Sequence, residues 1–135
     1  MRHLRRHQRV FVISFWGETL MQQIESLYIV EFGDVAGFGY RNGGVVVLET
    51  NRVFGGDSGY FYLGDYSVFG DRFEASVQIT KHNLTWVNAF GDAALQFNIR
   101  VSGNIVDDII VATMERLDRP GFSLPLRLIR KASLP

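Results

Sequence analysis

Apolar and polar side chains alternate at every second position over much of this chain, and this alternation constrains the fold more than any other feature. In the segment Arg72 to Lys81, one face carries Phe73, Ala75, Val77 and Ile79, and the other carries polar or charged side chains. Successive side chains of a strand point to opposite faces, so one face of this segment meets a core and the other meets water. The segment Ala93 to Ser102 repeats the pattern, with Leu95 and Phe97 on the apolar face. The period therefore predicts antiparallel β structure.

Turn residues interrupt the alternation every eight to twelve positions, as in an all-β domain. The predicted turns are 41–44, 69–71, 102–104 and 119–121. Between them we expect further strands at 27–32, 44–49, 51–55, 60–67, 105–115 and 122–130. About eight antiparallel strands in a chain of this size favour a closed small barrel, with a two-sheet sandwich as the alternative. Pro125 cannot donate to a ladder and predicts an edge, a bulge or a strand end.

Charge and cysteine content narrow the function classes. The 14 basic and 14 acidic residues balance, and the chain contains no cysteine. A balanced charge gives no excess of positive charge that would favour direct binding of nucleic acid or of an anionic membrane surface. Without cysteine there is no disulfide, thiolate metal site or cysteine nucleophile, which fits a reducing cytosol. We expect a cytoplasmic protein, with which this composition is compatible.

The first twenty residues differ from the rest, because basic side chains precede a short apolar run, Val10 to Trp16. That run is too short to span a bilayer, and no small-residue cleavage pattern follows it. We expect residues 1–20 to be an N-terminal extension that is poorly ordered or not native, and residues 21–135 to form one barrel domain. An extra strand, a short helix or a targeting segment are the alternatives for the extension.

The tetrapeptide Gly56-Asp57-Ser58-Gly59 has the local sequence that surrounds the nucleophile of chymotrypsin-like serine proteases. A serine nucleophile needs a base, a group that orients the base and oxyanion donors. Outside the N-terminal segment, the sequence offers His82 as its only histidine. The better interpretation is a turn between two strands, in which Asp57 and Ser58 bond backbone donors. We therefore expect no enzymatic activity and no catalytic residue.

Three tyrosines, Tyr60, Tyr62 and Tyr66, share one face of the strand that follows this turn. Tyrosine is favoured both in amphipathic cavity linings and at protein interfaces. The row is thus a possible ligand or partner face, or an ordinary set of strand aromatics whose hydroxyls reach the rim.

Metal and cofactor sites are weakly supported. His82, Asp71 and Asp92 could in principle bind a metal, but no ligand spacing points to one. Asp107 and Asp108 are strand neighbours in this prediction, and neighbours point to opposite faces. We therefore predict neither a metal nor a cofactor.

Several segments together resemble the GrlR-like family of bacterial proteins, named for a negative regulator of type III secretion. They read GGDSGYFYLGDY, FEASVQITKHN, FGDAALQFNIRVSG and PGFSLPLRLIRK, and the resemblance spans about 21–131. The resemblance implies a lipocalin-like barrel of eight antiparallel strands and a non-enzymatic regulatory protein that acts through protein contacts. It also implies a homodimer.

In that family, an acidic hairpin is tied to the capture of a transcriptional activator. The corresponding hairpin here contains Val68, Phe69, Asp71 and Arg72, with Asp71 as its only acid. Partner choice depends on such charge complementarity, so the partner stays unassigned. The alternative function is a carrier or sensor of a small apolar ligand, because an eight-stranded barrel can hold one small molecule.

Overall fold

The computed structural model of this protein describes the backbone of residues 9–13, 19–35, 37, 39–40 and 42–135, and the side chains of these residues from 24 onward. The described residues contain ten strands and no helix. The strands are β1 (Arg9–Ile13), β2 (Thr19–Gln23), β3 (Ser26–Phe32), β4 (Asn42–Glu49), β5 (Arg52–Gly56), β6 (Tyr60–Phe69), β7 (Arg72–Lys81), β8 (Gln96–Val106), β9 (Ile109–Arg116) and β10 (Ser123–Ser133).

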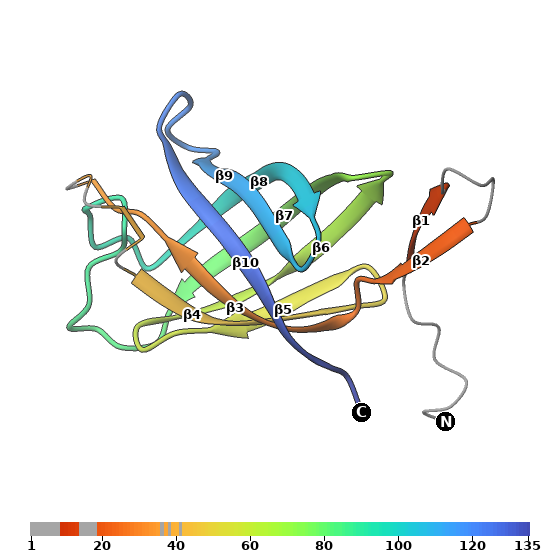
Figure 1. The fold of residues 1–135 in the computed structure, drawn as a ribbon. Helices are drawn as coiled ribbons and strands as arrows, with labels where there is room; N and C mark the ends of the chain where they lie inside the picture. Colours follow the sequence, from red (N-terminus) through yellow and green to blue (C-terminus); the bar gives the residue numbers. More distant parts are fainter. Residues whose placement is uncertain (1–8, 14–18, 36, 38, 41) are drawn as a thin grey trace.

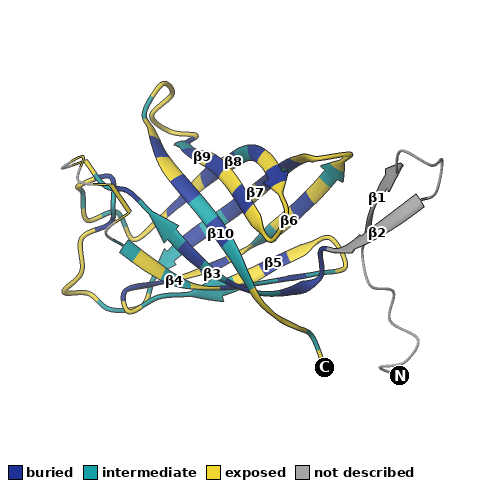
Figure 2. Cartoon of the chain, viewed as in Figure 1, coloured by how far each residue is buried: buried dark blue, intermediate teal, exposed yellow. Residues whose placement is uncertain are grey.

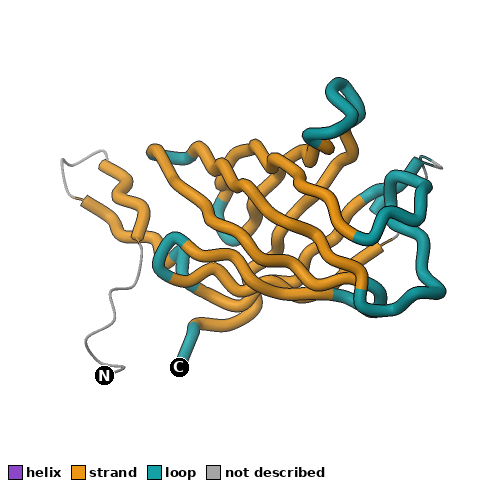
Figure 3. The backbone as a smooth tube through the Cα atoms, turned by 180° about the vertical axis from the view of Figure 1, so that it is seen from behind, coloured by secondary structure: helices purple, strands orange, loops and turns teal. Residues whose placement is uncertain are grey.

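Strands β3 to β10 form one closed, eight-stranded antiparallel barrel (Figure 1). Each strand pairs with the next along the chain, and β10 closes the barrel by pairing with β3. The closing ladder runs from Leu126 opposite Phe32 to Ser133 opposite Ser26, with one register shift after Arg130. Figure 3 shows the same barrel from behind, with its loops at the two ends. The predicted closed barrel is confirmed, and the sandwich alternative is wrong.

The alternation predicted from the sequence is also the burial pattern of the barrel wall (Figure 2). In β7 the side chains of Phe73, Ala75, Val77 and Ile79 are all buried, and in β8 Phe97, Ile99 and Val101 are buried. The side chains between them face water or are partly covered. One apolar core therefore fills the barrel, and each strand contributes alternate residues to it.

The predicted turn at residues 102–104 is wrong, because β8 continues through Gly103 to Val106. Gly103 pairs with Phe73 on one side and Ala112 on the other, and a Cβ there would collide with the Val111 carbonyl oxygen and with Ala112. This glycine permits close approach of neighbouring backbones inside a strand. The turn lies instead at Asp107, whose φ is 57°, a value that aspartate tolerates better than most residues. The predicted strand 105–115 is therefore the end of β8, a turn and β9.

Pro125 and Leu95 differ from their predicted positions. Pro125 is the third residue of β10 and pairs with Thr113 of β9. It lies just before the β10–β3 ladder begins at Leu126, and its carbonyl accepts the Gly33 N–H beyond the last residue of β3, so it is at the end of the pairing with β3 and not at the end of its own strand. Leu95, predicted to face the core, is 64% exposed because β8 begins only at Gln96.

Strands β1 and β2 form a separate two-stranded sheet outside the barrel wall (Figure 1). Residues 1–8 and 14–18 of the predicted N-terminal extension lie outside the described residues. The assignment of residues 1–20 as an extension of the barrel domain stays a prediction.

Candidate functional site

The turn that joins β5 to β6 is organised by the side chain of Asp57. Its Oδ1 accepts hydrogen bonds from the backbone N–H groups of Gly59 and Tyr60, both at 2.8 Å. The Asp57 N–H in turn donates to the Tyr60 carbonyl at 2.9 Å. An aspartate that bonds backbone donors two and three residues ahead is a recurrent turn-forming arrangement. Gly55 and Gly56, which precede it, belong to β5 and do not have the positive φ that a glycine kink would use.

Ser58, the nucleophile of the protease-like interpretation, is exposed on this turn. Among the described residues, its hydroxyl makes no hydrogen bond to His82. The His82 Nε2 atom lies 2.9 Å from the Asp57 carbonyl oxygen, and the His82 N–H donates to the Gly59 carbonyl. His82 therefore stabilises the turn through contacts with its backbone and is not arranged as the base of a serine nucleophile.

The three tyrosines of β6 all point into the barrel and are buried, with exposed fractions of 4 to 7%. They therefore do not form an outward-facing contact surface. Tyr60 and Tyr62 line the internal cavity, and the Tyr60 hydroxyl points to the Trp86 carbonyl at 3.5 Å.

Tyr66 is not among the residues that line this cavity, and it stacks on Phe73 with ring centroids 5.7 Å apart. Its hydroxyl lies near the Asn51 backbone but makes no well-formed hydrogen bond within the described part of the chain. Burial raises the pKa of Tyr66, and the negative charge of Glu25 raises it further. Tyr66 is therefore a neutral core residue.

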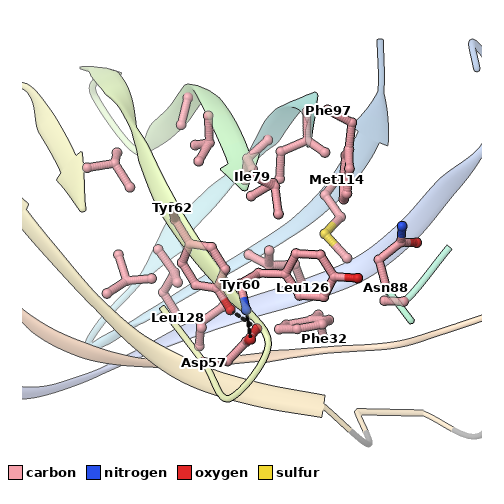
Figure 4. A pocket seen from close by; sticks show the side chains of 18 of the residues that line it. Phe32, Asp57, Tyr60, Tyr62, Ile79, Asn88, Phe97, Met114, Leu126 and Leu128 are labelled. Atoms are coloured by element: carbon pink, nitrogen blue, oxygen red, sulfur yellow. Dashed lines mark hydrogen bonds between the residues drawn. The ribbon is translucent and has the colours of Figure 1, made fainter. Parts of the chain in front are cut away.

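A cavity of about 90 Å³ lies inside the barrel next to Asp57 and the first two tyrosines (Figure 4). Its wall is almost entirely apolar. It includes Phe32, Leu48, Phe73, Val77, Phe90, Phe97, Met114, Leu126 and Leu128. The polar side chains among its lining residues are Asp57, Tyr60, Tyr62 and Asn88, and Asp57 contributes the one carboxyl group among them. A few polar groups in an apolar concavity are typical of a small-molecule site.

The Asp57 carboxylate is anchored in the cavity wall by a hydrogen bond from the Tyr62 hydroxyl to Oδ2. Burial raises the pKa of Tyr62, and the hydrogen bond to Asp57 raises it further, so this phenol stays protonated and acts as a donor. Gly44 makes room for the pair, because a Cβ at this position would lie 3.0 Å from both the Tyr62 hydroxyl and the Asp57 Cβ.

The loop of residues 82–95 covers the end of the barrel next to this cavity. Phe90 is 4% exposed and packs edge-on against Phe97 and Phe122, with centroid distances of 5.9 and 5.2 Å. Asn88 shapes the loop, because its Oδ1 accepts the Phe90 N–H at 2.8 Å and its Nδ2 donates to Asp92 at 2.7 Å. Phe90 thus closes this end of the barrel.

Arg116 is the last residue of β9 and only 3% exposed, and its side chain holds this loop in place. Its guanidinium binds both carboxylate oxygens of Asp118 at 2.8 and 2.9 Å and donates to Asp92 at 2.6 Å. The same group lies over the rings of Phe97 and Phe90, 4.4 and 5.7 Å from their centroids. The hydrogen bond to Asp118, followed by that to Asp92, raises the pKa of Arg116, so it stays charged within the core.

Low pH is expected to weaken the contact between Arg116 and the loop, because Asp92 loses its charge when it is protonated. Burial acts to raise the pKa of Asp92, but hydrogen bonds from Asn88, Ala94 and Arg116 outweigh it and lower the pKa to about 2 from an ordinary 3.8. A folded-state pKa below the unfolded value stabilises the folded state above the unfolded pKa, and this stabilisation is lost as the pH falls through the folded pKa. The contribution is therefore present above about pH 4 and disappears between pH 4 and pH 2.

Urea unfolding at pH 6, 4 and 2.5 would test this, with Asp92→Asn as the comparison. Asparagine keeps the loop's hydrogen-bond acceptor but loses the charge. The stability advantage of the natural chain over the variant should shrink as the pH falls from 4 to 2.5. A constant difference would show that Asp92 is not ionised against Arg116.

The hairpin between β6 and β7 lies at the other end of the barrel. Val68 packs against the core, whereas Phe69 is 81% exposed at the tip. The Asp71 carbonyl accepts the Ile105 N–H at 2.6 Å, and Arg72 pairs with Glu74 at 2.9 Å. Val68 lies opposite Phe73, on which Tyr66 stacks, whereas Phe69, Asp71 and Arg72 are exposed, so the tip presents an aromatic side chain beside one acid.

A second apolar feature lies outside the barrel, where cross-strand neighbours of β4, β5 and β6 point outward. The register places Val47, Phe54 and Leu63 in one row and Val45, Gly56 and Phe61 in the next. Val45, Phe54, Phe61 and Leu63 are 37 to 52% exposed, and Val47 is partly covered. We call these five side chains, Val45, Val47, Phe54, Phe61 and Leu63, the outer apolar patch. Contiguous exposed apolar groups of this kind mark interaction surfaces.

Sequence reasoning missed the roles of Arg116, Asp92 and Asn88. One signal was available, since Arg116 continues the inward series of Ile110, Ala112 and Met114, and a charged residue at a core-facing position needs a partner. No comparable signal pointed to Asn88, because its contacts are made within an irregular loop.

Within the described residues, no three His, Asp or Glu side chains gather as a metal site, and no helix could cross a membrane. Nor do His82, Asp71 and Asp92, which were considered as possible ligands and rejected, gather within this described part of the chain. Comparison with known protein families found no match, and comparison with curated proteins found none either.

Proposed function

We propose that this protein is a non-enzymatic, cytoplasmic interaction barrel that regulates through protein contacts, as its resemblance to the GrlR-like family implies. The outer apolar patch carries the proposal, because it exposes four large apolar side chains side by side on three neighbouring strands. A regulatory partner, such as a transcriptional regulator, would contact the exposed hairpin around Phe69, where an aromatic anchor replaces the acidic run of the family.

The occupant proposed for the outer apolar patch is a second copy of the chain. The patch itself carries no charge, so two copies can meet across a twofold axis without like-charge repulsion. Its edge is formed by Glu49, Arg52 and Asp65, which lie opposite one another on β4, β5 and β6. Arg52 lies between the two acids of this row, so its charge offsets part of theirs at the edge of the patch.

Sedimentation velocity over a range of protein concentrations would test the homodimer. We expect reversible dimerisation, and we expect Val45→Asp to weaken it by about tenfold or more, because two like charges would be buried together. The matched control is Val111→Asp on β9, since Val111 is 48% exposed and Val45 is 42% exposed. Val111→Asp should leave the dissociation constant nearly unchanged. A chain that stays monomeric at all concentrations, or equal effects of the two variants, would contradict the proposal.

The second candidate function is binding of a small, mainly apolar ligand inside the barrel. The cavity of about 90 Å³ with one carboxylate in an apolar wall favours it. Native mass spectrometry of the protein purified without detergent, together with displacement of an apolar fluorescent probe, would test this function. A barrel that neither retains nor binds any small molecule would remove it.

A further inference from the structure

The carboxylate of Asp57 has no cationic partner among the described residues, although it lines an apolar cavity. Ion pairs within the described part of the barrel include those of Glu31, Glu74, Asp92 and Asp118. Lys81 lies opposite Tyr60 on β7, but its Nζ points to the Ala93 carbonyl at 3.4 Å and over the Tyr60 ring. Within the described residues the Asp57 carboxylate is thus in no ion pair, and His82, which contacts this residue, reaches its backbone carbonyl oxygen instead.

The hydrogen bonds of Asp57 leave an acceptor position open. A carboxylate has about four acceptor positions. Oδ1 takes the N–H groups of Gly59 and Tyr60, and Oδ2 takes the Tyr62 hydroxyl. One acceptor position therefore remains on Oδ2, the oxygen that Tyr62 contacts beside the cavity.

Aromatic side chains surround this position, with Phe32, Tyr60 and Tyr62 grouped around Asp57 in Figure 4. Aromatic faces attract cations, most strongly where water is excluded. A carboxylate and aromatic faces together favour a cationic group over a neutral one, and they disfavour an anion.

The volume of the cavity limits the apolar part of a ligand. An engineered cavity of about 150 Å³ holds benzene, so about 90 Å³ suits a chain of about three to five carbons. We propose that the cavity binds a short-chain primary alkylammonium ion, with its hydrocarbon tail inside the barrel and its ammonium group on Asp57 Oδ2. This inference rests on the second candidate function, ligand binding by the barrel.

Three probes of equal chain length would test the head-group preference. n-Butylammonium, n-butanol and butyrate are titrated into ¹⁵N-labelled full-length protein near neutral pH, and amide shifts are followed by NMR. We expect butylammonium to bind about tenfold or more tightly than butanol, with shifts at Tyr60, Tyr62 and Asn88, and butyrate not to bind.

Asp57→Asn is the decisive variant, because asparagine keeps the side-chain acceptor of the turn and removes the charge. It should reduce butylammonium binding to the level of butanol and leave butanol binding unchanged. Tyr62→Phe keeps the carboxylate and removes the hydrogen bond that competes for Oδ2, so butylammonium should bind more tightly relative to butanol, and an unchanged preference would contradict contact with Oδ2. This second variant keeps the test open if Asp57→Asn fails to fold.

The possible results distinguish the head-group inference from the ligand-binding function. If butanol binds as tightly as butylammonium, or if Asp57→Asn keeps the full affinity for butylammonium, the head-group inference is wrong while the ligand-binding function stands. If none of the three probes produces shifts at the cavity, both are wrong.

Discussion

Phe73→Ala is expected to lower the free energy of unfolding by about 3–5 kcal/mol, the range for removing a buried phenylalanine ring. Phe73 is 1% exposed, stacks on Tyr66 and lines the internal cavity. The cost of such a truncation depends on how far the surroundings collapse into the new space. A closed ladder of eight strands restrains that collapse, and the lost ring would extend a cavity that already exists. We therefore expect the upper half of the range, measured by urea unfolding.

Phe69→Ala is the matched control, because it removes the same atoms from a side chain that is 81% exposed. Its effect should stay within about 0.5 kcal/mol, as for most surface substitutions. Similar losses for the two variants would mean that the hairpin tip is covered in the folded protein, or that the ring of Phe73 is not in the core.

Arg116→Ala is expected to cost about 2–3 kcal/mol. Removing one partner of a buried ion pair typically costs about 3–5 kcal/mol, and the partial exposure of Asp92 and Asp118 reduces the expected loss. Their side chains are 37% and 58% exposed, whereas that of Arg116 is 4% exposed. The variant also loses the cationic contact with Phe97 and Phe90.

Arg119→Ala tests whether the position of the charge matters. Arg119 also reaches Asp92, at 3.1 Å, but its side chain is 43% exposed. An exposed ion pair contributes less than about 1 kcal/mol, so this variant should be nearly as stable as the natural chain. Arg116→Met separates charge from packing, because methionine fills much of the same space without the guanidinium. Full stability of Arg116→Met would show that the ion pairs with Asp92 and Asp118 do not hold the loop.

The barrel could be predicted because its information is local and repeated. Phe73 to Ile79 on β7 and Phe97 to Val101 on β8 alternate strictly, and each alternation reports which face is buried. The turn positions were less predictable, because glycine serves two purposes. Gly70 has a positive φ of 58° in a turn, whereas Gly103 allows a close approach of strands. The pair Gly103-Asn104 could belong to a turn or to the inside of a strand. Only the residues that pair with it in the folded structure distinguish the two.

The candidate site was predictable only in part. The turn at Asp57 and the common face of Tyr60, Tyr62 and Tyr66 follow from short-range rules. Which way that face points does not, because both faces of β6 are aromatic or apolar, with Phe61 and Leu63 outside. Curvature and closure of the sheet decided it.

The sequence by itself determined an all-β chain with about eight strands, the core faces of β7 and β8, and a turn in place of a serine nucleophile. Only the tertiary structure decided that the tyrosines are internal and that Asp57 shares a cavity wall with residues of β3, β8 and β10. It also decided that Arg116 fastens the loop through Asp92, 24 residues away. The physical reason is the sequence separation over which each interaction acts. Alternation and turn chemistry act between near neighbours, whereas cavities and buried ion pairs arise only when distant strands close into a barrel.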